Sequence, residues 1–424
     1  MSKKILTLSN YIKRMSKFSS QKKYVLGFLL FIFCTTAFSQ KLKRVRHFGR
    51  NKGHLKMYAY TPSTIDKTKP AALVVVLHGC LQCAGSVASQ TGWSKLADEN
   101  GFYVLYPQQR MINNPEKCFK WYRRRHINKN RGENASILKM IENMKANYAI
   151  DASKVYITGL SAGAAMSVVM MADYPEVFNA GAIFAGVPYK AGTNIVTIDM
   201  LFFGWMRKKP ERWGNLVRKQ NPDYTGVYPR MIIYQGSNDW IVNKHNGVEL
   251  MKQWTNLHNI GPYPSEVIYQ YVNNIDIERN VYRTPEKKDA VIFYKINRLS
   301  HALLVDPGTC PQQGGRRGFF SKDKNYFSTL FTSYDFGLIA PPVIEGKTNV
   351  LPQEQNITYT VPFNDKSTYE WTYPADCSVV KNDKTNSITL NWGKQPGCIN
   401  VSETDAAGCK KTYQTLFVNL NKPQ

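Results

Sequence analysis

The sequence is poor in acidic residues: 30 Asp and Glu stand against 56 Lys and Arg, which gives a formal net charge of +26. Residues 1–40 contain seven Lys or Arg and no acid. Such an excess of positive charge can attract acidic polymers, anionic cell surfaces or nucleic acid. No nucleic-acid-binding motif accompanies the charge, so we expect a solvated basic surface and no nucleic-acid partner.

The sequence also lacks internal repeats and low-complexity tracts. Its 43% hydrophobic and 12% aromatic content is ordinary for a globular protein and excludes collagen-like and disordered classes. The 424 residues have room for one large domain, a small one and a buried core.

No hydrophobic run near the N-terminus is long enough to span a bilayer comfortably, because the apolar stretch covers only Val25–Phe33. Two lysines precede this stretch and small residues follow it, which predicts a secretory signal peptide over residues 1–40. Cys34 does not suit a lipid-attachment site, because the large Phe33 precedes it. We therefore expect a secreted protein.

No cysteine spacing is joined by the histidine pattern that is typical of zinc, so we expect neither a metal nor a cofactor. Export makes disulfides the more plausible use of cysteine. Beyond Cys34, four cysteines in the first part of the chain allow three pairings, and three in the last part leave one odd. These are Cys80, Cys83, Cys118 and Cys310, then Cys377, Cys398 and Cys409.

The stretch Lys154–Met166 reads as a short strand, a glycine-bracketed serine and a helix of small residues. This is the G-x-S-x-G nucleophile elbow in the context that it requires. Gly159 and Gly163 keep side chains away from the place where strand and helix nearly touch, and the Ser161 hydroxyl is exposed on a strained turn.

Buried apolar strands alternate with helical segments through residues 41–339, which predicts a doubly wound, mostly parallel α/β sheet. The nucleophile elbow is typical of the α/β-hydrolase form of such a sheet. Residues 190–228 form a long excursion. From residue 340 to residue 424 the helical pattern is replaced by short alternating strands, which predict a small all-β, immunoglobulin-like sandwich. The strands expected in the first domain are 55–60, 72–77, 101–106, 154–159, 180–186, 231–236 and 291–296, and the helices are 85–100, 133–148 and 247–258.

A serine hydroxyl needs a base and a carboxylate that orients the base. In this fold they follow the serine in the order acid, then histidine. We assign Ser161 as the nucleophile, Asp239 as the orienting acid and His301 as the base. His245 and His258 are the alternatives, but they fall on or beside the helix that follows Asp239.

The oxyanion of the tetrahedral intermediate needs fixed N–H donors. We expect one at Ala162, beside the nucleophile, and the second at Cys80 or Leu81, in the loop that begins His78-Gly79 after the first buried strand.

Several further motifs lie in one family's order over roughly residues 55–335. They are Leu77–Gln82, Cys118–Tyr122, Gly132-Glu133, Val155–Gly163, Gly186–Tyr189 and Asn238–Val242. On these residues the chain resembles the secreted polyhydroxybutyrate (PHB) depolymerase-type esterases, which include feruloyl and acetylxylan esterases.

The resemblance implies that Ser161, Asp239 and His301 form the catalytic triad. It also suggests a Cys80–Cys118 disulfide at the oxyanion loop, and a Cys83–Cys310 bridge is our own further inference.

One departure concerns the substrate pocket: the family carries an Ala-Trp pair after the histidine, where this chain has Ala302-Leu303. Because this aromatic side chain is missing, we expect Trp121 and Trp240 to form the pocket wall instead. We place His78, Trp121, Tyr189 and Trp240 at the pocket, and Trp371 and Trp392 in the core of the sandwich.

We therefore expect a secreted serine carboxylesterase that acts on a polyhydroxyalkanoate polyester or on acyl or feruloyl esters of polysaccharides. The C-terminal domain resembles PKD-like modules, for which contact with polymer or cell surface, or a spacer role, is expected. The alternatives are an adhesion or carbohydrate-binding protein with a vestigial hydrolase domain, and a peptidase of the same fold.

Overall fold

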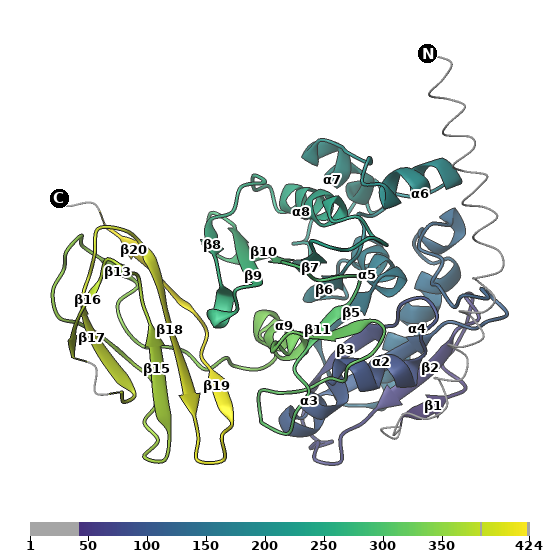
Figure 1. The fold of residues 1–424 in the computed structure, drawn as a ribbon. Coiled ribbons are helices and arrows are strands. Elements are labelled where there is room, and N and C mark those ends of the chain that lie inside the picture. The colour runs from purple at the N-terminus through teal and green to yellow at the C-terminus, as the bar shows by residue number, and fades with distance from the viewer. Residues whose placement is uncertain (1–41, 382–383, 422–424) are drawn as a thin grey trace.

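The computed structural model describes residues 42–381 and 384–421. The predicted signal peptide lies outside the described residues. A large α/β part and a smaller all-β part lie side by side (Figure 1). Among the described residues, none of the helices has the length and apolarity that crossing a membrane requires.

A ten-stranded sheet forms the centre of the α/β part, in the order β1-β2-β4-β3-β5-β6-β7-β10-β9-β8. The strands from β4 to β10 are parallel to their neighbours, and both edges of the sheet are antiparallel. The mostly parallel sheet is confirmed. Its strands are β1 (Lys43–Val45), β2 (Lys56–Tyr60), β3 (Ala71–Leu77), β4 (Tyr103–Gln108), β5 (Ile150–Leu160), β6 (Ala180–Phe184), β7 (Arg230–Gly236), β8 (Glu266–Ile268), β9 (Ile277–Arg283) and β10 (Asp289–Ile296).

Helices cover both faces of this sheet, which is why the central strands are apolar on both sides. Helices α4, α5 and α8 pack on one face and α2, α3 and α9 on the other. Their bounds are α2 (Ala84–Thr91), α3 (Trp93–Asn100), α4 (Gly132–Asn147), α5 (Ala162–Asp173), α8 (His245–Leu257) and α9 (Ser328–Phe336). Two helices occupy the predicted excursion, α6 (Ile195–Phe202) and α7 (Pro210–Arg218), and the short strands β11 (Leu303–Val305) and β12 (Ser321–Asp323) pair beside α9.

The single helix predicted over residues 85–100 is wrong in one respect: Gly92 divides it into α2 and α3. Gly92 has φ of +72°, and a Cβ there would lie 2.8 Å from the Phe327 ring. Glycine adopts this left-handed conformation without steric cost, so the chain turns at this residue.

The C-terminal part consists of two mostly antiparallel sheets that pack face to face around their own core, as predicted. Trp371 and Trp392 lie in that core. One sheet has the order β13-β20-β18-β15, with β19 also paired to β18, and the other β14-β17-β16. The strands are β13 (Asn349–Val350), β14 (Ile357–Thr360), β15 (Thr368–Thr372), β16 (Ser378–Lys381), β17 (Ser387–Asn391), β18 (Gly397–Thr404), β19 (Lys410–Thr412) and β20 (Leu416–Leu420).

The two parts are joined covalently by a disulfide between Cys310 and Cys409. The inferred Cys83–Cys310 bridge is therefore wrong. The sequence analysis sought a partner for Cys310 only among the cysteines of the first domain. Cys409 lies in the C-terminal domain, directly before β19, so that search could not find it. Gln312 reinforces the junction, donating to Thr412 O at 3.0 Å and accepting from Thr412 N at 2.7 Å.

Removing this disulfide tests the pairing. We expect Cys310→Ser combined with Cys409→Ser to lower stability by about 2–4 kcal/mol, because the cross-link restricts the unfolded chain. In scanning calorimetry the sandwich should then melt earlier than the α/β part. Cys83→Ser is the control, and an equal loss in that variant would contradict the pairing.

Candidate active site

Ser161 occupies a tight turn between β5 and α5. Its backbone has φ of +57° and ψ of −119°, a conformation that side-chain-bearing residues rarely adopt. The Ser161 N–H donates to Phe184 O at 2.9 Å, which anchors the turn to β6. The side chain is half-buried.

Two glycines allow β5 and α5 to approach each other here. A Cβ on Gly159 would lie 2.5 Å from the backbone of Gly163, and a Cβ on Gly163 would lie 2.3 Å from Leu77 O. Any larger residue would push α5 away from β3 and β5, so both glycines are sterically required.

Asp239 and His301 form a buried hydrogen-bonded pair in the loops that follow β7 and β10. The His301 Nδ1 to Asp239 Oδ2 distance is 2.8 Å, and both side chains are at most 5% exposed. This geometry fixes the imidazole with Nε2 free to face a reacting hydroxyl.

The Asp239 carboxylate is itself held from three directions. Its Oδ1 accepts the N–H groups of Ile241 at 2.9 Å and Val242 at 2.8 Å. The Gln235 Nε2 lies 3.4 Å from Oδ2. The sequence prediction missed Gln235. The signal that could have identified it is a polar glutamine at the end of the apolar strand 231–236.

Ser161, Asp239 and His301 lie beyond the same carboxyl edge of the sheet, after β5, β7 and β10. Ser161 and His301, both among the described residues, are not hydrogen-bonded to each other in this structure. In enzymes without bound substrate, such catalytic hydrogen bonds are often long and shorten only when substrate binds. The alternative His258 contacts Pro229 O at 3.3 Å, at the opposite edge of the sheet. His245 begins α8 and is not hydrogen-bonded to a carboxylate among the described residues.

The two residues expected to offer the second oxyanion donor differ in whether the backbone N–H group already has an acceptor. Leu81 N–H donates to Glu116 O at 2.6 Å and is therefore occupied. Cys80 N–H has no acceptor among the described residues, and the Cys80–Cys118 disulfide ties its loop to the segment after β4. That disulfide agrees with the pairing that the resemblance suggested.

His78 braces this loop from inside and does not line a pocket. It is fully buried, its Nδ1 contacts Gly79 O at 2.7 Å, and its Nε2 accepts from Gln109 N at 3.0 Å. Burial lowers the pKa of His78 to about 4, so the ring is neutral. Gln109 in turn donates to the buried Glu133 at 2.6 Å, and burial raises the pKa of Glu133 to about 7.

The other predicted pocket residues are scattered. Tyr189 is buried, with its hydroxyl 3.0 Å from Asp173 Oδ1. Trp121 is half-buried against the core, whereas Trp240 is 92% exposed beside Asp239.

An aromatic side chain does reach the histidine, from a segment that sequence reasoning did not consider. The Phe320 ring lies edge-on to the His301 ring, with centroids 6.2 Å apart. Leu303 N–H donates to Phe320 O at 2.9 Å, so the residue that replaces the family's tryptophan is paired to this phenylalanine.

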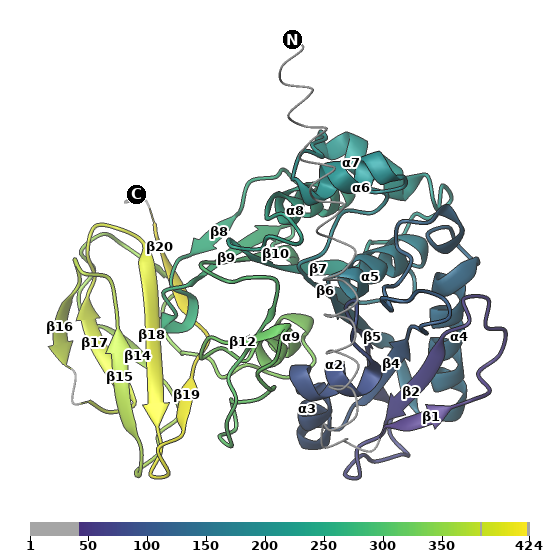
Figure 2. The ribbon, with the colours of Figure 1, turned by 45° about the vertical axis from the view of Figure 1, so that its right-hand side comes forward.

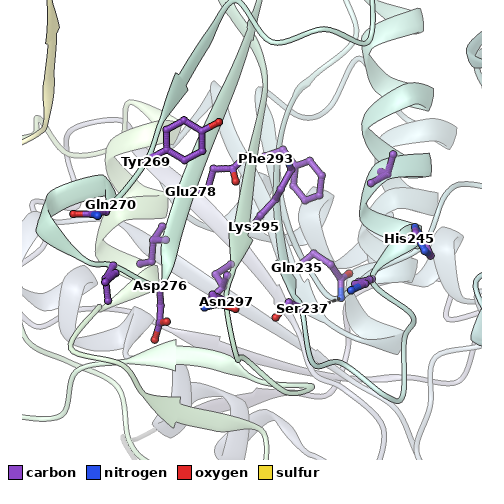
Figure 3. Close-up of a pocket in the computed structure, with 16 residues that line it drawn as sticks. Gln235, Ser237, His245, Tyr269, Gln270, Asp276, Glu278, Phe293, Lys295 and Asn297 are labelled. Carbon is purple, nitrogen blue, oxygen red and sulfur yellow. Dashed lines mark hydrogen bonds and ion pairs between the residues drawn. The ribbon is translucent and has the colours of Figure 1, made fainter. Parts of the chain in front are cut away.

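A pocket of about 600 Å³ lies between α8 and the ends of β7, β9 and β10 (Figure 3). Gln235 and Ser237 line it together with His245, Tyr269 and Lys295, but Ser161 and His301 do not. It adjoins the Asp239 loop through Gln235. No cluster of three or more His, Cys, Asp or Glu in the described part of the chain could hold a metal ion.

The doubly wound sheet with a nucleophile-elbow turn between β5 and α5 defines an α/β-hydrolase. An acetyl xylan esterase from Aspergillus awamori shares this fold, with a TM-score of 0.57 and 26% identity over 62% of this chain and 94% of that structure.

The sequence comparisons specify the family. A family model described as esterase PHB depolymerase matches residues 56–260, and a PKD-like domain model matches residues 338–418. Poly(3-hydroxyalkanoate) depolymerase C of Paucimonas lemoignei is 39% identical over 300 residues, which are 70% of each chain. Feruloyl esterase B of Neurospora crassa is 34% identical over 57% of this chain and 86% of its own. The chain belongs to the PHB depolymerase-type esterase family and is a carboxylic ester hydrolase.

The glycine contact at the elbow can be tested directly. We expect Gly163→Ala to cost more than about 3 kcal/mol or to prevent folding, because the added Cβ overlaps backbone of β3. The neighbouring Ala164→Gly should cost only about 1 kcal/mol through helix propensity. Urea unfolding measures both variants, and equal losses would contradict the steric account.

Asp173 gives a pH-dependent prediction. Burial raises its pKa from 3.8 to about 8, against the hydrogen bonds from Tyr189 and Asn134. The folded chain therefore holds a proton that the unfolded chain releases near pH 4, so this residue's contribution to stability falls as pH rises from 4 to 8.

We expect Asp173→Asn to flatten the stability profile between pH 5 and pH 8 by a few kcal/mol, since each pKa unit corresponds to about 1.36 kcal/mol. Chemical unfolding at the two pH values measures the effect. Asp223→Asn, at an exposed position, is the control; an Asp173→Asn profile as steep as wild type would contradict the prediction.

Proposed function

We propose that this protein is a serine esterase in which Ser161 attacks the ester, His301 moves the proton and Asp239 orients the imidazole. The observation that carries the proposal is the buried 2.8 Å His301–Asp239 bond at the sheet edge to which the elbow presents Ser161. The family's esterase chemistry supports the same assignment.

In the first half-reaction, His301 Nε2 accepts the Ser161 proton as Oγ bonds to the ester carbon. The C–O bond to the alcohol then breaks, and His301 returns the proton to the leaving oxygen. In the second half-reaction, His301 takes a proton from water, the hydroxide oxygen bonds to the acyl carbon, and Ser161 leaves with the proton. The products are one alcohol and one carboxylic acid.

Two N–H groups would stabilise the tetrahedral oxyanion in both halves. Ala162 N–H opens α5, where the first-turn donors have no intrahelical acceptor and the helix dipole favours negative charge. We assign the second donor to Cys80 N–H, in the loop after β3. A Cβ on Gly79, the residue before Cys80, would lie 3.6 Å from Ser161 Cβ, so the loop that carries Cys80 borders the proposed nucleophile.

We infer that the substrate is a polymer, either a hydroxyalkanoate polyester or a polysaccharide that carries acyl or feruloyl esters. The named relatives support both classes. Asn246 Nδ2 donates to Leu201 O at 3.0 Å, which holds the C-terminal end of α6 beside the segment that follows Asp239. Large apolar side chains are exposed on these two segments, and they suit contact with a polymer surface. These side chains are Phe202, Phe203, Trp205, Trp240 and Ile241. We also propose that the protein is secreted and that its C-terminal sandwich contacts a polymer or a cell surface.

The triad is tested with a soluble p-nitrophenyl ester. We expect Ser161→Ala and His301→Ala each to lower kcat by at least about 10³-fold, because each removes a member of one proton-transfer unit. His245→Ala and His258→Ala are matched controls and should retain activity near wild type. Full activity in His301→Ala, with loss in either control, would refute the assignment, and circular dichroism checks that each variant folds.

The substrate class is tested separately by product release from polyhydroxybutyrate film, acetylated xylan and methyl ferulate. Hydrolysis of the film alone assigns the polyester class, and release of acetate or ferulate without film hydrolysis assigns the polysaccharide class. Turnover of none of the three, with the p-nitrophenyl ester still cleaved, would contradict both.

A further inference from the structure

Positive charge is concentrated in two segments of the α/β part. Residues 42–65 and 109–132 together contain 14 Lys and Arg but a single acid, Glu116. By contrast, residues 340–424 contain eight acidic and eight basic residues. Half of the chain's net charge of +26 therefore falls in these two segments.

The fold brings these two segments together. Lys52 Nζ donates to Asn130 O at 2.7 Å, and Asn113 Nδ2 donates to Gly53 O at 3.0 Å. A groove of about 860 Å³ lies between them, and we call it the basic groove. Its lining has six basic side chains and no acid: Arg50, Lys52, His54, Arg124, Arg125 and Arg131, with Asn51, Asn128, Asn130 and Gly132.

The cations of the basic groove lack internal counter-ions. Among the described residues, Lys129 forms the only ion pair made by the 14 Lys and Arg of the two segments, to Glu176 at 3.1 Å. The groove cations are exposed to solvent. The pKa of nearby His126 is lowered to about 4, by burial first and then by the positive charges of Lys120, Arg125 and Arg123. Clustered like charges repel one another, and an anionic partner would relieve that repulsion.

The position of the groove leaves it open to a partner. In both ribbon views β1, β2 and α4 lie on the side of the α/β part away from the C-terminal sandwich (Figures 1 and 2). The segment 109–132 is also tied to the oxyanion loop by the Cys80–Cys118 disulfide. A polymer held in the groove would therefore lie on the molecule that carries the proposed active site, without competing with the sandwich.

We propose that the basic groove binds an acidic polysaccharide, one whose sugar units carry carboxylates, and so holds the enzyme on such a polymer. Guanidinium groups pair with carboxylates through two parallel hydrogen bonds. Several arginines along one open groove match a chain with a carboxylate on each repeating unit. This binding is separate from the ester chemistry proposed above and does not require it.

The experiment measures binding of the whole chain to soluble polygalacturonate by titration calorimetry. The probe is compared with neutral arabinoxylan of similar length, with a DNA duplex and with anionic phosphatidylglycerol vesicles. We expect measurable binding to polygalacturonate, none to arabinoxylan, and at least a tenfold loss of affinity between 50 and 200 mM NaCl, because salt screens the charges.

The triple variant Arg124→Ser, Arg125→Ser, Arg131→Ser should lose at least about tenfold in affinity for polygalacturonate. The matched control, Lys209→Ser, Arg212→Ser, Lys219→Ser, removes the same charge near α7 and should bind as wild type does. Hydrolysis of a soluble p-nitrophenyl ester should be unchanged in both. Ser161→Ala should bind polygalacturonate normally, which separates failure of this proposal from failure of the proposed triad.

Equal losses in the two triple variants would show that net charge alone drives binding and would overturn the proposal. Tighter binding to DNA or to vesicles than to polygalacturonate would overturn the choice of partner. Absence of binding to polygalacturonate at 50 mM NaCl would overturn the site itself.

Discussion

The close contact of β5 and α5 at Gly159 and Gly163 is the constraint on which the site depends. Gly163 lies directly against the last carbonyl of β3, so the turn that presents Ser161 is locked to the loop that begins at His78. The proposed nucleophile and the proposed oxyanion loop are thereby placed by one steric contact. The strained backbone of Ser161 persists because packing on both sides leaves no alternative.

Buried polar networks hold the surrounding loops. The Asp239 carboxylate accepts two backbone N–H groups while it orients His301, so the loop and the imidazole share one anchor. On the other side, His78, Gln109 and Glu133 connect the oxyanion loop to α4. The buried Asp239 and Glu133 carboxylates in these networks accept hydrogen bonds, whereas the buried Gln235 Oε1 has no partner among the described residues. The bonds that are made rigidify the groups that the proposed chemistry needs.

The local pattern of residues along the chain was sufficient to predict much of this architecture. Continuous apolar runs identified the central strands, and the glycine-bracketed serine identified the elbow, because both depend on neighbouring residues. Contacts between distant segments were not readable in the same way. The antiparallel edge strands β8 and β9 are short or polar, Cys310 pairs across a domain boundary, and Phe320 reaches His301 from a separate loop. Tyr189 and His78 have aromatic rings suited to a pocket, yet internal hydrogen bonds keep them buried.

The central claim is that Ser161 is a nucleophile activated by His301. The most direct measurement is peptide mass spectrometry after treatment of the folded chain with a fluorophosphonate, which reacts with activated serines. The account predicts one phosphonyl adduct per molecule, on the peptide that contains Ser161, and loss of that adduct in His301→Ala. An unlabelled folded chain, or an adduct on another serine, would contradict it.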